Sequence, residues 1–260
     1  ITNTNGFEYK RAKWPWYAKL YFRYAEAAAA LVSSSLISDS IHVVAYYKKR
    51  YGKKSTFVAY GTDVPTDDAL ESSKPHFEKF LTEHGLERRG YHVVVMRMEP
   101  ENSIGSIVDA GLQGKHAMPI LLIGPSTPFF EKITEGIPSD SKRVIVAGPI
   151  YDRGLLFLLR KNACSYLHGH TVGGINPTIL EALSTGTPVI ARETLFNCEV
   201  LEDAGLYFNT SKELTEQIGK LEGSDPAQWE ARAQMVADKQ RAAFTWESVV
   251  SEYEDLAVRA

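Results

Sequence analysis

Short apolar segments alternate with helix-like segments along most of this chain, from residue 91 onward. Strands are predicted at residues 92–96, 120–123, 143–147, 163–167, 188–191 and 206–208. Helices are predicted between them at residues 103–112, 127–134, 152–161, 178–184 and 196–201. This alternation indicates an α/β fold in which helices cover both faces of a parallel sheet. Ligands of such sheets bind at the carboxyl ends of the strands, so the residues that follow each strand are candidates for function.

The segments on either side of this region are also expected to be regular. Helices are predicted at residues 13–32, 41–51, 75–84, 211–221, 226–243 and 245–258, and short strands at 36–40 (with a turn) and 55–60. A polar stretch that opens at Gly61 is the candidate linker between two parts of the chain.

The composition is typical of a globular protein, with 44% hydrophobic and 23% charged residues. No apolar run is long enough to span a bilayer, and no secretory signal is visible. Cys164 and Cys198 lack metal or disulfide spacing and are expected to be reduced core thiols. The net charge of −3 hides an asymmetry, because residues 1–60 hold ten basic and three acidic residues and so carry +7, which leaves −10 for the rest. The two parts are therefore expected to face different partners.

One segment carries most of the functional signal, and its sequence from His168 to Leu183 is HGHTVGGINPTILEAL. A glycine turn follows a predicted strand, and Asn176 and Pro177 then open a helix, since they favour the N-cap and the first helical position. Free N–H groups and the helix dipole make such a start an anion site. Glu181 lies one turn further along, where a carboxylate can accept hydrogen bonds from sugar hydroxyls. A nucleotide diphosphate joined to a sugar fits this arrangement, although glycine turns alone occur in any doubly wound α/β protein.

The whole segment resembles the donor-site signature of the retaining, GT-B-fold glycosyltransferases of family 4, E-G-F-G-x-x-x-x-E-A. It is most similar to the rhamnosyltransferase-like branch, H-G-H-x-V-G-G-x-N-P-x-x-L-E-A. The resemblance extends over almost the whole chain and implies two Rossmann-like domains. Residues 1–62 would end the N-terminal acceptor-side domain, whose earlier strands are expected to be absent because the chain begins at Ile1 rather than Met. Residues 63–90 would link it to the donor-binding domain, residues 91–244.

The resemblance implies that the last helix, residues 245–260, packs back on the first domain. An apolar stripe of Trp246, Val249, Val250 and Tyr253 suits that contact.

Arg97 follows a predicted strand and would hold the diphosphate with paired hydrogen bonds, with a surface ion pair as the alternative. The family carries a Lys five residues on, but this chain has Asn102, which would bind the donor or only cap the next helix. The first Glu of the family motif is Gly173 here, so that carboxylate is missing. His168 or His170 would contact the sugar or a phosphate oxygen, or be structural.

Glu181 would bind the ribose, the loop from Gly148 to Tyr151 would hold the base, and Asn197 would line the sugar side. The expected catalytic residues are Arg97, His170 and Glu181. The expected donor-binding residues are Asn102, Gly148, Ile150, Tyr151, His168, Gly173, Gly174, Asn176, Pro177, Thr178 and Asn197.

A basic and aromatic stretch near the N-terminus suits a membrane interface, with aromatics at headgroup level and cations on anionic lipid. The expected acceptor-side or membrane-side residues are Lys10, Arg11, Lys13, Trp14 and Trp16. An amphipathic helix packed on its own domain is the alternative. Nucleic acid is disfavoured as a partner, because the remainder is acidic and carries no nucleic-acid motif.

The resemblance implies transfer of a hexose or deoxyhexose, with rhamnose from dTDP-rhamnose as the closest match. The acceptor would be a saccharide, lipid-linked at the cytoplasmic face of the cell membrane, in cell-surface polysaccharide synthesis. No cofactor or metal is expected, because no Asp-x-Asp motif occurs and Arg97 with the helix dipole can stabilise the leaving diphosphate. Two alternatives remain, a non-catalytic nucleotide-sugar binding fragment and a GT-B-fold sugar-nucleotide epimerase. A homodimer is expected if an incomplete first domain exposes apolar surface.

Overall fold

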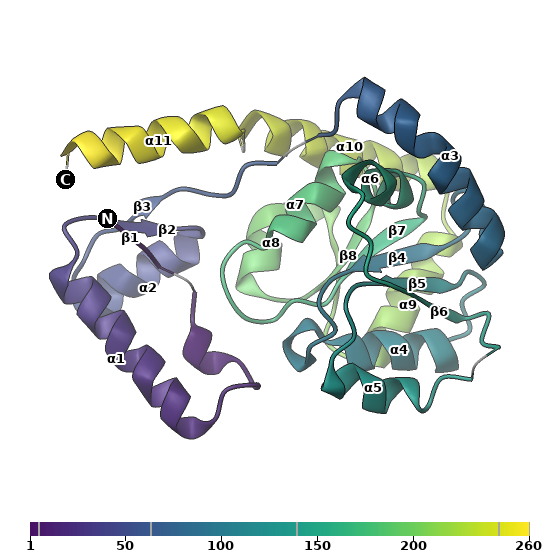
Figure 1. Cartoon of the computed structure of the whole chain (residues 1–260), viewed down its shortest axis with the longest axis horizontal. Coiled ribbons are helices and arrows are strands. Elements are labelled where there is room, and N and C mark those ends of the chain that lie inside the picture. The colour runs from purple at the N-terminus through teal and green to yellow at the C-terminus, as the bar shows by residue number, and fades with distance from the viewer. Residues whose placement is uncertain (5, 63, 139, 244, 260) are drawn as a thin grey trace.

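The computed structural model describes residues 1–4, 6–62, 64–138, 140–243 and 245–259. Within these ranges the strands form two parallel sheets (Figure 1). The smaller sheet has the order β1–β2–β3, and the larger has the order β6–β5–β4–β7–β8–β9. The expectation of an α/β fold with parallel sheets is therefore confirmed.

The larger sheet forms the centre of the second part of the chain. Its strands are β4 (His92–Val95), β5 (Ile120–Ile123), β6 (Val144–Gly148), β7 (Ser165–His168), β8 (Val189–Arg192) and β9 (Leu206–Phe208). The chain runs outward from β4 to β6, returns to the other side of β4 as β7, and then runs outward again to β9. The strand order reverses between β4 and β7, and the crevice outside the carboxyl ends at such a point is where these sheets bind ligands.

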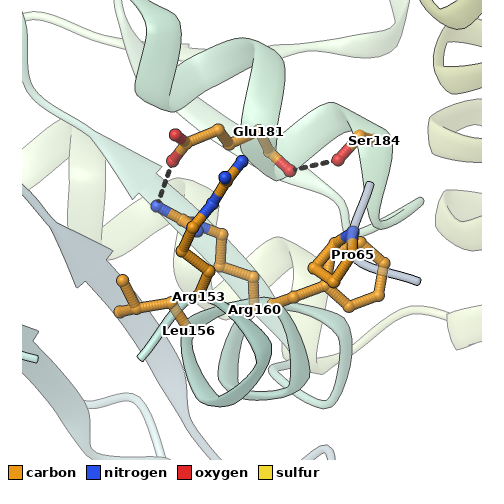
Figure 2. Close-up of a pocket in the computed structure, with 7 residues that line it drawn as sticks. Pro65, Arg153, Leu156, Arg160, Glu181 and Ser184 are labelled. Atoms are coloured by element: carbon orange, nitrogen blue, oxygen red, sulfur yellow. Dashed lines mark hydrogen bonds and ion pairs between the residues drawn. The ribbon is translucent and has the colours of Figure 1, made fainter. Parts of the chain in front are cut away.

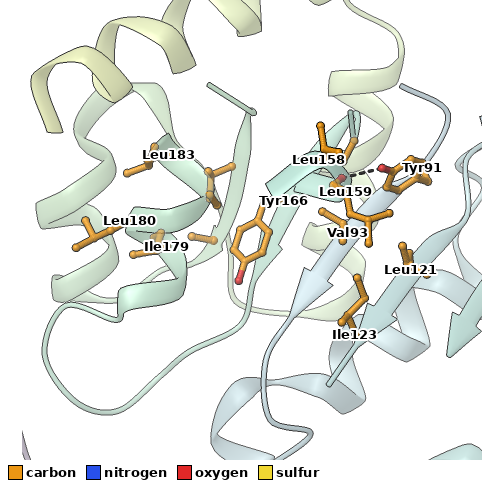
Figure 3. Close-up of a cluster of buried hydrophobic side chains, with 14 of the residues drawn as sticks. Tyr91, Val93, Leu121, Ile123, Leu158, Leu159, Tyr166, Ile179, Leu180 and Leu183 are labelled. Atoms are coloured by element: carbon orange, nitrogen blue, oxygen red, sulfur yellow. Dashed lines mark hydrogen bonds between the residues drawn. The ribbon is translucent and has the colours of Figure 1, made fainter. Parts of the chain in front are cut away.

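Helices cover both faces of this sheet. They are α3 (Asp67–His84), α4 (Ile104–Gln113), α5 (Pro128–Thr134), α6 (Arg153–Lys161), α7 (Pro177–Ser184), α8 (Leu195–Leu201), α9 (Ser211–Glu222) and α10 (Pro226–Ala243). The buried cluster on one face joins the sheet to α3, α6 and α7, and the cluster on the other face joins it to α4, α5 and α9. Val93 and Val94 of β4 belong to different clusters, because successive side chains of a strand point to opposite faces. Figure 3 shows the first cluster, where the buried Tyr91 hydroxyl donates to the Leu159 carbonyl oxygen at 2.7 Å.

The smaller sheet lies beside the C-terminal helix. It consists of β1 (Thr2–Thr4), β2 (Leu36–Ser38) and β3 (Thr56–Phe57), with α1 (Trp16–Val32) and α2 (Ile41–Tyr51) between the strands. Helix α11 (Trp246–Arg259) runs along this sheet, while α10 lies beside the larger part (Figure 1). Val249 of α11 is buried with Ile37 and Val58, and Asn3 donates from Nδ2 to the Tyr253 hydroxyl at 3.0 Å. The end of the chain therefore contacts both parts.

Three elements differ from the sequence prediction. Strand β1 was not predicted, because its Thr-Asn-Thr sequence carries no apolar signal. Helix α3 begins at Asp67 rather than at residue 75, since the Thr66 hydroxyl caps it by accepting from the Ala69 amide, and Pro75 lies inside the helix. Strand β3 is shorter than the predicted 55–60. The predicted boundaries at residues 63 and 244 and the chain end at residue 260 lie outside the described residues.

Candidate functional site

A polar cleft lies between the carboxyl ends of the two sheets. From the first part of the chain it is lined by Gly6, Glu8, Arg11, Asp39 and Tyr60. From the second part it is lined by Arg97, His170, Gly173, Gly174, Ile175, Asn176 and Pro177. The second set follows β4 and β7, the two strands at the point of reversal. The cleft therefore brings Arg97, His170 and the glycine turn together with Arg11.

Helix α7 begins at the wall of this cleft. The Asn176 side chain caps it, because its Oδ1 accepts from the Thr178 amide at 2.9 Å and from the Thr178 hydroxyl at 2.8 Å. Pro177 takes the first helical position, where its missing N–H does not break the helix. The predicted helix start therefore lies where its positive end faces the cleft. Thr178 stabilises the cap and does not line the cleft.

His170 is held in place by two asparagines. Its Nδ1 lies 2.9 Å from the Oδ1 of Asn102, whose Nδ2 donates to the Arg97 carbonyl oxygen at 2.7 Å. Asn197 donates from Nδ2 to the His170 carbonyl oxygen at 3.1 Å. Burial, and then the Arg11 charge, lowers the pKa of His170 to about 4. The imidazole is therefore neutral at neutral pH, and Asn102 and Asn197 support the site from behind rather than line it.

His168 lies beneath this layer at the end of β7. It is 1% exposed, and its ring stacks on Tyr166 with centroids 5.9 Å apart. Burial lowers its pKa well below the ordinary histidine value. Neither ring nitrogen has a hydrogen-bond partner among the described residues. His168 is thus a neutral core residue next to His170, at 6.0 Å between ring centroids.

Glu181 lines a second pocket one turn further along α7. That pocket is bounded by Pro65, Arg153, Leu156, Phe157, Arg160, Glu181 and Ser184 (Figure 2). The Arg160 Nη2 lies 2.6 Å from the Glu181 Oε2, and this buried guanidinium fixes a carboxylate whose side chain is 44% exposed. Glu181 is four positions after Pro177 along the helix, which corresponds to a rise of about 6 Å. One helix therefore contributes to both the polar cleft and the second pocket.

The predicted base loop follows β6. Gly148 has a left-handed backbone (φ +72°), which a glycine adopts without strain. Ile150 packs against the buried cluster of Figure 3, and Tyr151 is 84% exposed. None of these three residues lines either of the two pockets just described.

On the first part of the chain, Glu8 and Arg11 form the opposite wall of the cleft. Arg11 pairs through Nε with the Glu8 Oε1 at 2.7 Å and through Nη1 with the buried Glu101 Oε1 at 3.4 Å. Trp14 donates from Nε1 to the Glu8 Oε2 at 3.3 Å. Arg11 therefore links the two parts of the molecule across the cleft.

The other residues of the basic and aromatic stretch do not line the cleft. The Lys10 ammonium lies 4.3 Å from the Phe7 ring centroid, and the Lys13 ammonium lies 5.1 Å from that of Trp14. Trp16 is 77% exposed at the start of α1.

Sequence reasoning missed Asp39, Tyr60 and Gly6. Asp39 directly follows β2, so the rule that pointed to Arg97 after β4, applied to the small sheet, would have found it. Asp39 is 7% exposed, and burial raises the pKa of its carboxyl to about 6, with the Glu199 charge adding to the effect. A Cβ added at Gly6 would lie 2.8 Å from the Gly173 carbonyl carbon, so the two loops meet backbone to backbone.

Comparisons with known proteins agree with this architecture. A family model described as a domain of unknown function (DUF1972) matches residues 1–63. Among curated protein sequences, none matches this chain.

Several solved structures are similar in fold. Anabaena HepE in complex with UDP and glucose has a TM-score of 0.75 and 17% identity, covering 94% of this chain and 67% of HepE. Sucrose-phosphate synthase from Thermosynechococcus elongatus has a TM-score of 0.72 and 19% identity, covering 94% of this chain and 61% of that enzyme. A glycosyltransferase from Rickettsia africae has a TM-score of 0.71 and 15% identity, covering 94% and 66%. The chain thus spans about two thirds of the length of these proteins, and it has the fold of the GT-B glycosyltransferases.

Proposed function

We propose that this chain binds a nucleotide sugar in the polar cleft and serves as the donor-binding part of a glycosyltransferase. One observation carries the proposal. Arg97, the start of α7 and two adjacent glycines line the same cleft as Arg11, which lies on the opposite wall. Cations, a helix N-terminus and open backbone suit a diphosphate. The similar fold of HepE, solved with UDP-glucose, supports the same class of ligand.

In this proposal the two pockets along α7 divide the nucleotide sugar between them. Arg97 and the amides before Pro177 bind the diphosphate, and His170 contacts the sugar. The Glu181 carboxylate accepts a hydrogen bond from the ribose or deoxyribose of the nucleotide, while Arg160 holds the second carboxylate oxygen. The base lies toward the loop from Gly148 to Tyr151.

The reaction is the transfer of the sugar with retention of configuration. The bond between the anomeric carbon and the phosphate oxygen breaks, the bond to the acceptor oxygen forms on the same face, and the leaving phosphate takes the acceptor proton. Arg97, the dipole of α7 and the backbone amides stabilise the leaving diphosphate, so the step needs no metal or cofactor. The transferred sugar is a deoxyhexose such as rhamnose, carried by dTDP.

The acceptor is a saccharide, and a lipid-linked one suits the exposed face of α1. Trp16, Tyr17, Tyr21 and Tyr24 are all more than 60% exposed there, beside Lys13 and other cations. This face would rest on the cytoplasmic surface of a membrane. Within the described ranges, no helix has the length and apolar character to cross one.

Calorimetric titration with dTDP, UDP and GDP tests the proposal. The chain should bind one of them, and Glu181→Ala should weaken that binding about 10-fold or more, since a charged hydrogen bond contributes about 1.5–3 kcal/mol. Glu216→Ala is the matched control, because Glu216 is an exposed helical carboxylate of α9, on the other face of the sheet. Binding by none of the three nucleotides contradicts the proposed function. Binding of the nucleotide sugar without transfer to an acceptor identifies a donor-binding module that is not catalytic.

A further inference from the structure

Among the described residues that line the polar cleft, Asp39 has a deeply buried carboxyl. One of its two oxygens has no hydrogen-bond partner in the described part of the chain. Asp39 follows β2 and is only 7% exposed, and its Oδ1 accepts no hydrogen bond. Its neighbour Glu199 is satisfied, because it accepts from the Ser40 hydroxyl at 2.6 Å and the Ile41 amide at 2.9 Å. A buried polar atom left unpaired is costly and calls for a partner, which a water, an ion or a ligand can supply.

The donor loop offers no side chain of its own at this place. A Cβ added at Gly174 would lie 1.8 Å from the Asp39 Oδ1, so the carboxyl fills the space that a side chain at residue 174 would need. Gly173 is also bare and lies next to His170. Among the described residues, the acidic side chain that contacts Gly174 is therefore Asp39, which comes from across the cleft.

The position of Asp39 favours a sugar hydroxyl over a phosphate. A carboxylate repels a diphosphate, for which Arg97, Arg11 and the start of α7 are already available. Gly174 lies two residues before the Asn176 cap, so Asp39 is next to the place proposed for the diphosphate. The transferred sugar is bonded to that diphosphate. A hydrogen-bond acceptor next to the diphosphate would therefore meet the hydroxyls of this sugar.

We propose that Asp39 recognises the transferred sugar of the donor by accepting hydrogen bonds from its ring hydroxyls. The inference rests on the proposed function and assigns the specificity for the sugar to the first part of the chain. Burial, which holds the pKa of Asp39 near 6, still leaves the carboxyl ionised and able to accept at neutral pH. Asp39 is thus a residue that selects the sugar, while Arg97 and Glu181 hold the nucleotide.

The test compares a nucleoside diphosphate with its sugar conjugate, using UDP against UDP-glucose and dTDP against dTDP-rhamnose. For the pair that the chain binds, Asp39→Ala and the nearly isosteric Asp39→Asn should weaken binding of the sugar nucleotide by about 10- to 100-fold. Neither variant should weaken binding of the diphosphate alone, because a nearby carboxylate repels it. Asp109→Asn, an exposed carboxyl on α4, is the matched control.

Monodeoxy analogues of the bound sugar nucleotide sharpen the test. Loss of the hydroxyl that Asp39 contacts should weaken binding to the unsubstituted chain but not to Asp39→Ala, since the two changes remove the same hydrogen bond. If Asp39→Ala binds the sugar nucleotide as tightly as the unsubstituted chain does, the role of Asp39 is overturned while the nucleotide site stands. If neither the diphosphates nor the sugar nucleotides bind, the proposed function fails, and this inference fails with it.

Discussion

At the residue scale, the site combines ionisable groups whose pKa values burial shifts in the direction that favours the neutral form. His168 and His170 are shifted to low pKa, while Asp39 is shifted upward. The two kinds of shift make opposite contributions to the pH dependence of stability. Both follow from placing polar groups against the core at the ends of β2 and β7.

Substitution of Asp39 by Asn should stabilise the protein at pH 8. The folded carboxyl has a pKa of about 6 against 3.8 in the unfolded chain, so folding disfavours its ionised form above pH 6. The penalty is about 3 kcal/mol at pH 8 and disappears as the pH falls to 3.8, since each pKa unit corresponds to about 1.4 kcal/mol. Urea unfolding of both proteins at pH 8 and pH 4 measures the difference. If the unsubstituted protein and Asp39→Asn are equally stable at pH 8, burial does not destabilise the ionised carboxylate of Asp39.

His170 should remain unprotonated well below the usual pH for histidine. Its pKa is about 4 in the folded chain against 6.5 in the unfolded one, so the unfolded chain binds the proton first. The contribution of His170 to the free energy of unfolding is therefore fully present above pH 6.5 and is lost as the pH falls toward 4. NMR titration of the ring protons should give no midpoint above pH 5 for His170. A midpoint near 6.5 for His170 would contradict the burial of its ring beside Arg11.

At the element scale, the turn before α7 depends on glycine because two loops meet there. Gly174→Ala would place a methyl group within 1.8 Å of the Asp39 Oδ1, and the short buried side chain of Asp39 has little room to move. We expect a loss of about 1–3 kcal/mol in stability, as for other overpacked sites. Thermal unfolding measures it, with Gly219→Ala on α9 as the control, because a Cβ there meets nothing within 4 Å.

A double variant separates this clash from other effects of the substitution. Removal of the carboxyl in Gly174→Ala/Asp39→Ala should restore much of the lost stability, since the two side chains compete for the same space. Additive losses in the double variant would mean that the strain arises elsewhere in the turn.

The elements show which features the sequence can predict. The strands of the large sheet and the start of α7 follow from local signals, namely apolar runs and the Asn176-Pro177 pair. Asp39 carries only the weaker signal of its position directly after β2, because its role depends on the meeting of β2 with a turn 135 residues later in the sequence. Asn102 and Asn197 show the same limit, since their contacts with His170 join segments that no sequence spacing relates. Asn102, Asn197 and Arg11 could be named from the sequence as site residues, but the contacts by which they support His170 or span the cleft could not.

At the scale of the whole molecule, the cleft exists only while the two parts of the chain are held against each other. Three contacts connect the two parts near the site. They are the ion pair of Arg11 with Glu101, the backbone approach of Gly6 to Gly173, and the hydrogen bond from Ser40 to Glu199. Helix α11 connects them at a distance from it, because it continues from α10 on the large part and covers the small sheet (Figure 1). The polar cleft thus depends on a contact between α11 and the small sheet that does not line it.

Val249→Ala should therefore loosen the small sheet without unfolding the large one. Val249 is 9% exposed and packs on Ile37 and Val58, so its truncation should destabilise that contact by about 1–2 kcal/mol. Hydrogen exchange should speed up in peptides that contain β2, β3 and α11, and stay unchanged in those of β4 and β5, since regions of low local stability open separately. Val258→Ala on the same helix is the control, because Val258 is 89% exposed.

If hydrogen exchange rises equally in both sheets, the molecule unfolds as one unit, and α11 is part of a common core. If it rises only around the small sheet, binding of the sugar nucleotide should weaken more than binding of the diphosphate alone, because Asp39 is carried by the part that has come loose.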